Sequence, residues 1–180
     1  MIGMGDQLFK NKYRIKSIRF KDWDYSSNGA YYITICTKNR ECLFGKIVHG
    51  KIILNDIGEI IKQCWYDLSN HYGNCTLDEF VIMPDHFHGI VIIDNDHNHP
   101  IVEAGLKPAS TNNNAKRHGL FEIVRGFKTF SSRKINKIQN LFYFQWQRDY
   151  FEHIIRNENE LNRIREYIIN NPSKWEINQA

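Results

Sequence analysis

Two apolar runs in residues 81–93, joined across a Pro-Asp pair, restrict the fold of this chain more than any other stretch. The second run carries His86, Phe87 and His88 at its start and continues with four aliphatic residues. Because successive side chains of a β-strand point to opposite faces, His86 and His88 share one face and Phe87 takes the other. Such an apolar strand is typical of a sheet interior, where an unpartnered imidazole is costly. The pattern predicts either hydrogen-bonded histidines or a metal site.

Length and composition indicate one domain spanning residues 1–180. The chain has 180 residues, of which 42% are hydrophobic, enough for a single core. Its net charge of +4 permits a polyanionic partner without requiring one. The four cysteines show no C-x-x-C spacing, which favours free thiols in a reducing compartment. No apolar run approaches the ~20 residues of a membrane span. We therefore expect a cytoplasmic, soluble protein with no membrane partner.

Hydrophobic periodicity predicts alternating strands and helices along the chain. Two-residue periodicity and turn residues predict strands at 30–37, 75–83, 87–93 and 150–155, and a hairpin of 43–48 with 51–54 around His49-Gly50. Helical periodicity predicts helices at 56–68, 120–137 and 158–171, the first capped by Asn55 and the last begun by Asn157 and stopped by Pro172. The order of these elements is typical of an α+β fold.

Two segments differ in composition from the rest of the chain. Residues 1–28 form an arm in which basic residues, among them Arg14 and Arg19, alternate with aromatic ones. Such an arm can follow a nucleic-acid backbone and stack on bases, or it can pack over the core as a solvated segment. Residues 94–116 are rich in Asn, Asp and Pro and contain few apolar side chains, which predicts a flexible loop.

The predicted helix at 120–137 is strongly basic. Arg125, Lys128, Arg133 and Lys134 supply its charge, and no acidic residue follows Glu122 within it. An uncompensated basic face can hold phosphates, so these four residues are candidate DNA-binding residues. An ordinary solvated helix face is the competing interpretation.

The last predicted helix places a phenol and a carboxamide together. Tyr167 and Asn171 are four residues apart, so both lie on the flank of the apolar stripe. A tyrosine can form a covalent intermediate, and an asparagine oxygen can bind a metal ion. The competing interpretation is a half-buried tyrosine and an asparagine that caps the last carbonyls. Tyr150 is a rival nucleophile, but it precedes a strand and is not on the helix of Asn171.

These motifs, in this order, resemble those of single-tyrosine HUH transposases of the insertion-sequence type, most closely the REP-associated tyrosine transposases of bacteria. The resemblance rests on Met-Pro-Asp-His-Phe-His at 83–88 and on Tyr-Ile-x-x-Asn-Pro at 167–172. Further similarity lies in residues 29–34, 56–58 and 151–156. The third metal ligand is Gln in related insertion-sequence enzymes and corresponds to Asn171 here, in agreement with the REP-associated group.

The resemblance implies a ferredoxin-like βαββαβ core with an antiparallel sheet, followed by a C-terminal catalytic helix. It implies that His86, His88 and Asn171 hold Mg²⁺ or Mn²⁺, and that Tyr167 attacks the scissile phosphate. Attack would leave a 5′-phosphotyrosine and a free 3′-hydroxyl on single-stranded DNA that flanks a hairpin. Arg125, Lys128 and the basic arm are expected to hold this DNA.

Alternatives remain open at this level. The chain could be a DNA-hairpin binding regulator that keeps the fold without catalysis, or a relaxase or replication initiator of the same superfamily. The sequence also leaves open whether the catalytic helix stays in its own subunit or swaps within a homodimer. It does not distinguish Mg²⁺ from Mn²⁺, since both accept histidine and oxygen ligands.

Overall fold

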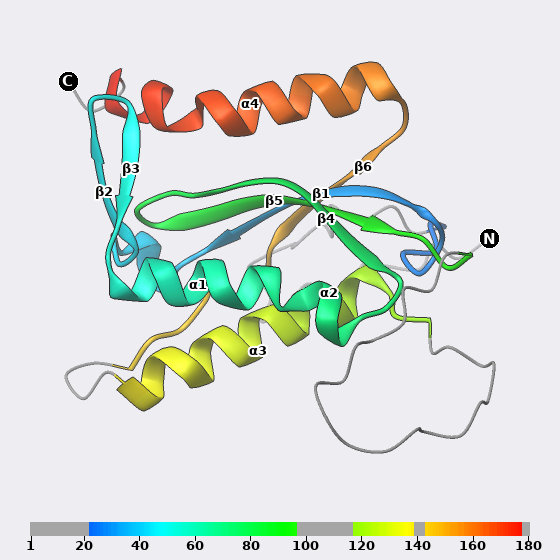
Figure 1. Ribbon diagram of the computed structural model, residues 1–180, viewed down its shortest axis with the longest axis horizontal. Coiled ribbons are helices and arrows are strands. Elements are labelled where there is room, and N and C mark those ends of the chain that lie inside the picture. Colours follow the sequence, from blue (N-terminus) through cyan, green and yellow to red (C-terminus); the bar gives the residue numbers. More distant parts are fainter. Residues whose placement is uncertain (1–21, 97–116, 139–142, 178–180) are drawn as a thin grey trace, which may run out of the picture.

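The computed structural model describes residues 22–96, 117–138 and 143–177, and Figure 1 shows a sheet between two helical layers. Helices α1 and α3 cover one face of the sheet, and helix α4 covers the other (Figure 1). The elements are β1 (Gly29–Cys36), the 3₁₀ turn η1 (Lys38–Arg40), β2 (Gly45–Val48), β3 (Lys51–Leu54), α1 (Asp56–Tyr66), α2 (Leu68–His71), β4 (Cys75–Ile82), β5 (His86–Ile93), α3 (Leu120–Ile138), β6 (Phe151–Ile155) and α4 (Glu158–Ile177).

The main sheet has the strand order β4-β5-β1-β6, and all three of its pairings are antiparallel. Without the separate β2–β3 hairpin, the chain order is β1-α1-β4-β5-α3-β6, which is the predicted βαββαβ arrangement. Strands β1 and β5 are central, so the strand that carries both histidines has a neighbour on each side. The predicted α+β fold with an antiparallel sheet is confirmed.

Side-chain alternation in the central strands builds two cores, one on each face of the sheet. The larger core lies under α1 and α3, where Phe87 packs against Trp65 and Phe127 with ring centroids 4.6 Å and 5.1 Å away. The smaller core lies under α4 and includes Ile90 of β5 and Ile168 of α4. Phe87 therefore faces one helical layer, and the two histidines beside it in sequence face the other.

Helix α1 starts where the sequence predicts. The side chain of Asn55 accepts a hydrogen bond from the backbone N–H of Gly58 at 3.0 Å, which satisfies one of the free N–H groups of the first turn. The apolar positions from Ile57 to Trp65 are buried at helical spacing. In α3 the apolar residues Leu120, Ile123, Val124 and Phe127 are buried at helical spacing. Phe130 is 42% exposed and lies beside the ring of His71.

The sequence predicted that helix α4 would stop at Pro172. In the structure the helix continues to Ile177. The tip of the β2–β3 hairpin holds this last part. The carboxylate of Glu176 accepts hydrogen bonds from the N–H groups of His49 (3.1 Å) and Gly50 (2.6 Å). Both residues have positive φ, 51° and 69°, the conformation that a two-residue hairpin turn requires. These tertiary contacts offset the hydrogen bond that proline removes from the helix.

The predicted arm at 1–28 and the predicted loop at 94–116 lie mostly outside the described residues, as do Arg14 and Arg19. Within the parts of the chain that the structure describes, no helix is long and apolar enough to cross a membrane.

We expect Gly58→Ala to lower the free energy of unfolding by about 1–3 kcal/mol, the usual cost of overpacking. A Cβ atom at Gly58 would lie 2.3 Å from the carbonyl oxygen of Phe44, so α1 would have to move. This cost opposes the gain of about 1 kcal/mol that alanine brings to a helix. Chemical denaturation would measure the change. Gly29→Ala is the control, because its Cβ would make only an ordinary 3.5 Å contact with Tyr31. A Gly58→Ala variant as stable as the parent would contradict this account.

Candidate functional site

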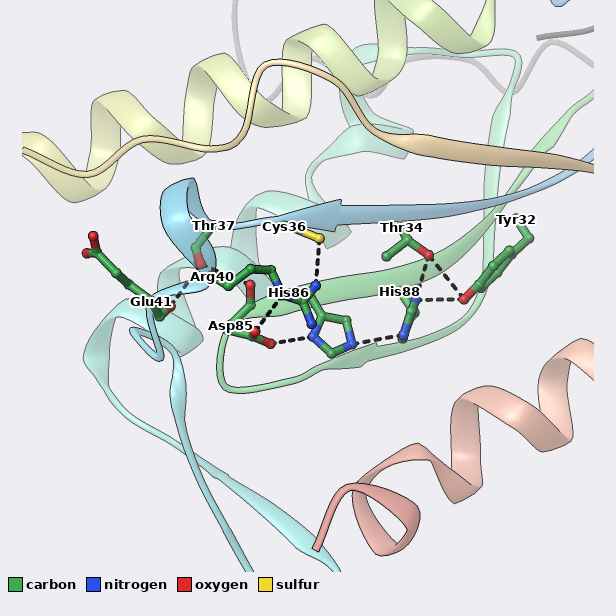
Figure 2. A network of polar contacts seen from close by, with 9 residues as sticks. All are labelled: Tyr32, Thr34, Cys36, Thr37, Arg40, Glu41, Asp85, His86 and His88. Atoms are coloured by element: carbon green, nitrogen blue, oxygen red, sulfur yellow. Dashed lines mark hydrogen bonds and ion pairs between the residues drawn. The ribbon is translucent and has the colours of Figure 1, made fainter. Parts of the chain in front are cut away.

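Two imidazoles meet on the face of the sheet that α4 covers. His86 and His88 are 5% and 4% exposed, and their Nε2 atoms are 3.0 Å apart (Figure 2). Each ring turns its other nitrogen, Nδ1, toward the protein. Both Nε2 atoms are thus directed at one shared space, as the alternation of side chains along β5 predicted.

An acidic residue orients the first imidazole. The carboxylate of Asp85 lies 2.5 Å from Nδ1 of His86 and 2.8 Å from Nε of Arg40 (Figure 2). Because an ionised carboxylate only accepts hydrogen bonds, the proton of a neutral His86 belongs on Nδ1 and its lone pair on Nε2. Arg40 reaches back to Asp85 from a turn in which Asn39 and Arg40 have φ of 58° and 59°. Such left-handed conformations are uncommon for residues other than glycine and need support from tertiary contacts.

Two hydroxyl groups on strand β1 orient the second imidazole. Nδ1 of His88 lies 2.7 Å from the hydroxyl of Tyr32 and 2.8 Å from that of Thr34 (Figure 2). Thr34 is the register partner of His88 across the β1–β5 ladder, and Tyr32 lies two residues before it on the same face. Strand pairing therefore supplies both partners, and a second nitrogen held in this way is typical of metal-binding histidines.

Burial keeps both imidazoles neutral. Loss of solvent lowers the pKa of His86, although the adjacent Asp85 carboxylate opposes part of this shift. Burial, and after it the repulsion that a protonated His86 would exert, lowers the pKa of His88 to about 3. Neutral imidazoles have a free lone pair for a metal ion, which protonated ones lack.

The donor set fits a small divalent cation. Two neighbouring ligands at about 2.1 Å from an octahedral ion lie roughly 3 Å apart, which matches the 3.0 Å between the two Nε2 atoms. Within the described residues, no group of three or more His, Cys, Asp and Glu side chains is placed to hold a metal ion. A third protein ligand would have to be another residue type, such as Asn171, which is buried on α4.

Helix α4 brings Tyr167 to the histidines. The ring centroid of Tyr167 lies 5.5 Å from that of His88 and 6.3 Å from that of Tyr32. Its side chain is 42% exposed, so a large substrate can reach it. Nζ of Lys174, two turns further along α4, lies 5.7 Å from the centroid of the Tyr167 ring. Tyr150 packs against the larger core on the other face of the sheet, so the structure does not bring this rival nucleophile to the histidines.

A partly buried ion pair joins α4 to strand β4 of the sheet. The guanidinium of Arg165 donates two hydrogen bonds, of 2.8 Å and 2.6 Å, to the two carboxylate oxygens of Asp78 on β4. These bonds lower the pKa of Asp78, so the carboxylate stays ionised. The pair lies half a turn before Tyr167, and Glu176 holds the helix beyond it. These contacts hold α4 on both sides of Tyr167.

Helix α3, which carries the basic candidates, lies on the opposite side of the sheet from α4 (Figure 1). Arg125, Lys128 and Arg133 line a cleft of about 890 Å³ between α3 and residues 143–150, together with Lys38 and Arg148. Lys134 is not among its lining residues and donates a hydrogen bond to the side chain of Gln63 at 3.2 Å. The structure therefore brings three of the four α3 candidates together, at a distance from Tyr167.

Lys128 differs from the other cations of this cleft. Its ammonium group donates to the carbonyl oxygens of Gln147 (2.7 Å) and Arg148 (2.8 Å), and burial lowers its pKa. Two of its three donors thus hold the segment before β6 against α3. Lys128 therefore holds one wall of the cleft in place and also adds positive charge to it.

Sequence reasoning missed the residues that hold the imidazoles. Asp85 directly precedes His86, and Tyr32 and Thr34 alternate on a predicted strand, so both signals were present. Strand register, which decides what lies opposite His88, was not readable from one sequence. Trp175, whose ring centroid is 5.6 Å from that of His86, depends on the continuation of α4 past proline.

We expect Asp85→Asn to weaken Mn²⁺ binding by about 10- to 100-fold, the usual effect of losing a partner of a metal-binding histidine. The substitution preserves shape but removes the negative charge that His86 and Arg40 share. Isothermal titration calorimetry would give the dissociation constants. Asp67→Asn, a change of the same kind at an exposed position, is the control. Equal affinity in the Asp85→Asn variant would show that the carboxylate has no role in metal binding.

Two proteins of Haemophilus influenzae are similar to this chain in sequence. No family model matches the chain. An uncharacterized protein of Haemophilus influenzae is 42% identical over 165 residues, which cover 91% of each chain. A second protein of that organism, named "Putative REP-associated tyrosine transposase", is 27% identical over 154 residues, or 84% of this chain and 74% of the relative.

A solved structure shares the fold. The structure of a REP-associated tyrosine transposase bound to a REP hairpin superposes with a TM-score of 0.58 at 16% identity, over 87% of this chain and 74% of that one. At this identity the likeness shows a shared fold. The chain therefore belongs to one family with the 42% identical Haemophilus influenzae protein, and it has the transposase-like fold that its resemblance to REP-associated tyrosine transposases predicts.

Proposed function

We propose that this protein is a tyrosine transposase that cuts and rejoins single-stranded DNA beside a hairpin, with Tyr167 as its nucleophile. One observation carries the proposal. An exposed phenol lies 5.5 Å, ring to ring, from His88, one of two buried and neutral imidazoles whose Nε2 atoms face each other. A nucleophile beside a site for a cation is the arrangement that phosphoryl transfer requires.

The proposed reaction is a transesterification at the scissile phosphate. The oxygen of Tyr167 bonds to the phosphorus of the scissile phosphate, and the bond from phosphorus to the 3′ oxygen breaks. The phenol loses its proton, and the departing oxygen gains one to become a 3′-hydroxyl. The product is a 5′-phosphotyrosine. A 3′-hydroxyl can attack this linkage in the reverse sense, so strands can be joined without a nucleotide cofactor.

His86, His88 and Asn171 would hold Mg²⁺ or Mn²⁺. A bound ion supplies positive charge that polarises the phosphate and stabilises the charge that develops during attack. The protein supplies the orientation: Asp85 and the hydroxyls of Tyr32 and Thr34 fix the imidazoles. Since the three proposed ligands are all neutral, they would not compensate the positive charge of the ion, which would remain available to the phosphate.

Lys174 adds a second positive charge near the nucleophile. Its ammonium group lies over the Tyr167 ring, 5.7 Å from the centroid. A cation there attracts the DNA phosphates to the nucleophile. We assign Lys174 a supporting role in substrate positioning.

The cleft along α3 is our candidate for the main DNA contact. Arg125, Lys128 and Arg133 line it with Lys38 and Arg148, and exposed Tyr143 adds an aromatic ring. Cations interleaved with aromatic rings suit a nucleic-acid backbone and its bases. The solved relative was bound to a REP hairpin, which supports a hairpin as the DNA partner here. Lys134 of α3, with Arg14 and Arg19 of the arm, completes the set of proposed phosphate contacts.

The test is the formation of a covalent protein–DNA adduct. The protein is incubated with Mg²⁺ or Mn²⁺ and with labelled single-stranded DNA that carries a hairpin from the flanks of its own gene. The products are separated on a denaturing gel. A metal-dependent adduct, absent with a chelator, is expected. Tight binding without an adduct for any metal or flank would overturn the catalytic proposal in favour of a DNA-hairpin binding regulator.

A further inference from the structure

A small pocket adjoins the candidate site on the α4 face of the sheet. It has a volume of about 320 Å³ and lies between β6 and the first half of α4. Its lining residues are Tyr32, Phe151, His153, Glu160, Arg163 and Ile164. Only Tyr32 belongs also to the network around the histidines, so the pocket and the site share one wall.

That shared wall connects the pocket to the nucleophile. The hydroxyl of Tyr32 lies 2.7 Å from Nδ1 of His88, and its ring centroid lies 6.3 Å from that of Tyr167. The ring of Phe151 packs edge-on against Tyr32 from the pocket side, with centroids 6.2 Å apart. A strand of DNA with its phosphate at Tyr167 would therefore have a neighbouring nucleotide close to Phe151.

The pocket walls suit a flat aromatic group. Phe151 is 42% exposed at the start of the edge strand β6, so its ring is accessible from the pocket. Ile164 and Tyr32 form the remaining apolar wall and are partly or fully buried. Every nucleobase has a face that stacks on an aromatic side chain, so an exposed Phe beside a DNA-cleaving site favours base binding.

The rim of the pocket carries polar groups of both signs. Glu160 is 2.8 Å from Nε2 of His153 and accepts a hydrogen bond from the backbone N–H of Arg156 at 2.8 Å. These bonds, the backbone one first, lower the pKa of Glu160, so its carboxylate is ionised and can accept from an exocyclic amine of a base. Arg163, exposed and one turn further along α4, provides a cation for the backbone phosphate.

We propose that this pocket is a base-binding subsite of the cleavage site. It takes one nucleobase within two nucleotides of the scissile phosphate, with the base face on Phe151 and the attached phosphate on Arg163. This inference rests on the proposed function, since it assumes that Tyr167 attacks DNA. It assigns a role in choosing the cleavage position to residues outside the metal-binding and nucleophile motifs.

An abasic scan tests the subsite. A series of hairpin substrates, each lacking one base near the scissile phosphate, is cleaved by the unmodified protein, and the initial rate of adduct formation is measured. Removing the base that occupies the pocket is expected to lower the rate by about 5- to 100-fold, the range for one stacked base. The other abasic positions should have smaller effects.

Variants assign that effect to the pocket. Phe151→Ala is expected to lower the rate on intact DNA by a similar factor and to remove the sensitivity to the critical abasic position. Phe151→Trp should retain both the rate and the sensitivity, because it keeps a stacking surface. Arg163→Ala, at an exposed position, should weaken DNA binding without removing the base preference. Tyr66→Ala is the matched control, an exposed aromatic residue (54%) on α1 beyond the other face of the sheet.

The outcomes separate the two proposals. If the unmodified protein forms the adduct but the abasic scan is flat, the subsite is refuted and the proposed function stands. If Phe151→Ala forms the adduct at the parent's rate and with the same base preference, the subsite is also refuted. If no adduct forms on any substrate, the proposed function fails, and the subsite with it.

Discussion

The Tyr167→Phe variant is expected to form covalent adduct at least about 10³-fold more slowly than the parent protein, because it has no oxygen to bond to phosphorus. The ring should keep its contacts with His88 and Tyr32, since the substitution removes only the hydroxyl group. Hairpin binding should therefore change by less than about twofold. Adduct formation on a denaturing gel and binding by fluorescence anisotropy measure the two effects separately.

Tyr150→Phe provides the matched control for this result. Tyr150 packs against the core on the α3 side of the sheet and lines the cleft there, so its hydroxyl is remote from the histidines. We expect normal adduct formation by this variant. An active Tyr167→Phe together with an inactive Tyr150→Phe would transfer the nucleophile to Tyr150 and would require a different site on the other face.

The His88→Ala variant is expected to lose at least about 100-fold in Mn²⁺ affinity and to form no adduct at concentrations that saturate the parent. His88 provides one of two Nε2 atoms that converge at 3.0 Å, and its loss leaves one imidazole and the amide of Asn171 as the proposed ligands. Electron paramagnetic resonance of free Mn²⁺ gives the affinity without reference to activity. This measurement distinguishes a loss of metal binding from a loss of DNA binding.

Two comparisons make the His88 result specific. The substitution leaves the buried hydroxyl of Tyr32 and that of Thr34 without the imidazole, at a cost of about 1–3 kcal/mol, so thermal unfolding must show that the variant is folded at the assay temperature. His71→Ala removes an exposed imidazole from α2 and should bind Mn²⁺ like the parent. Unchanged affinity in folded His88→Ala would remove this histidine from the metal site.

Much of the fold could be predicted from the sequence because its determinants are local. Alternation along β5 places His86 and His88 on the face opposite Phe87, whatever lies on either side. The cap at Asn55 needs only the three residues that follow it. The shared flank of Tyr167 and Asn171 follows from 3.6 residues per turn.

Other features depend on segments distant in sequence. Pro172 is a local signal for a helix end, but bonds from the hairpin tip to Glu176 carry α4 past it. The charge of α3 predicted a phosphate-binding face, but its position across the sheet from α4 is decided by how the helices pack on the two faces. Lys128 looked like a free cation in the sequence, and two backbone carbonyls bind it in the structure.

By itself, the sequence determined the elements, the order in which they form a βαββαβ core, and the residue types available for chemistry. The tertiary structure alone decided which side chains meet: Asp85 with His86, Tyr32 and Thr34 with His88, and the Tyr167 ring with the rings of His88 and Tyr32. The physical reason is the distance along the sequence over which each interaction acts. Strand alternation, helical periodicity and capping act over a few residues, whereas register and layer packing are set by the burial of the whole core.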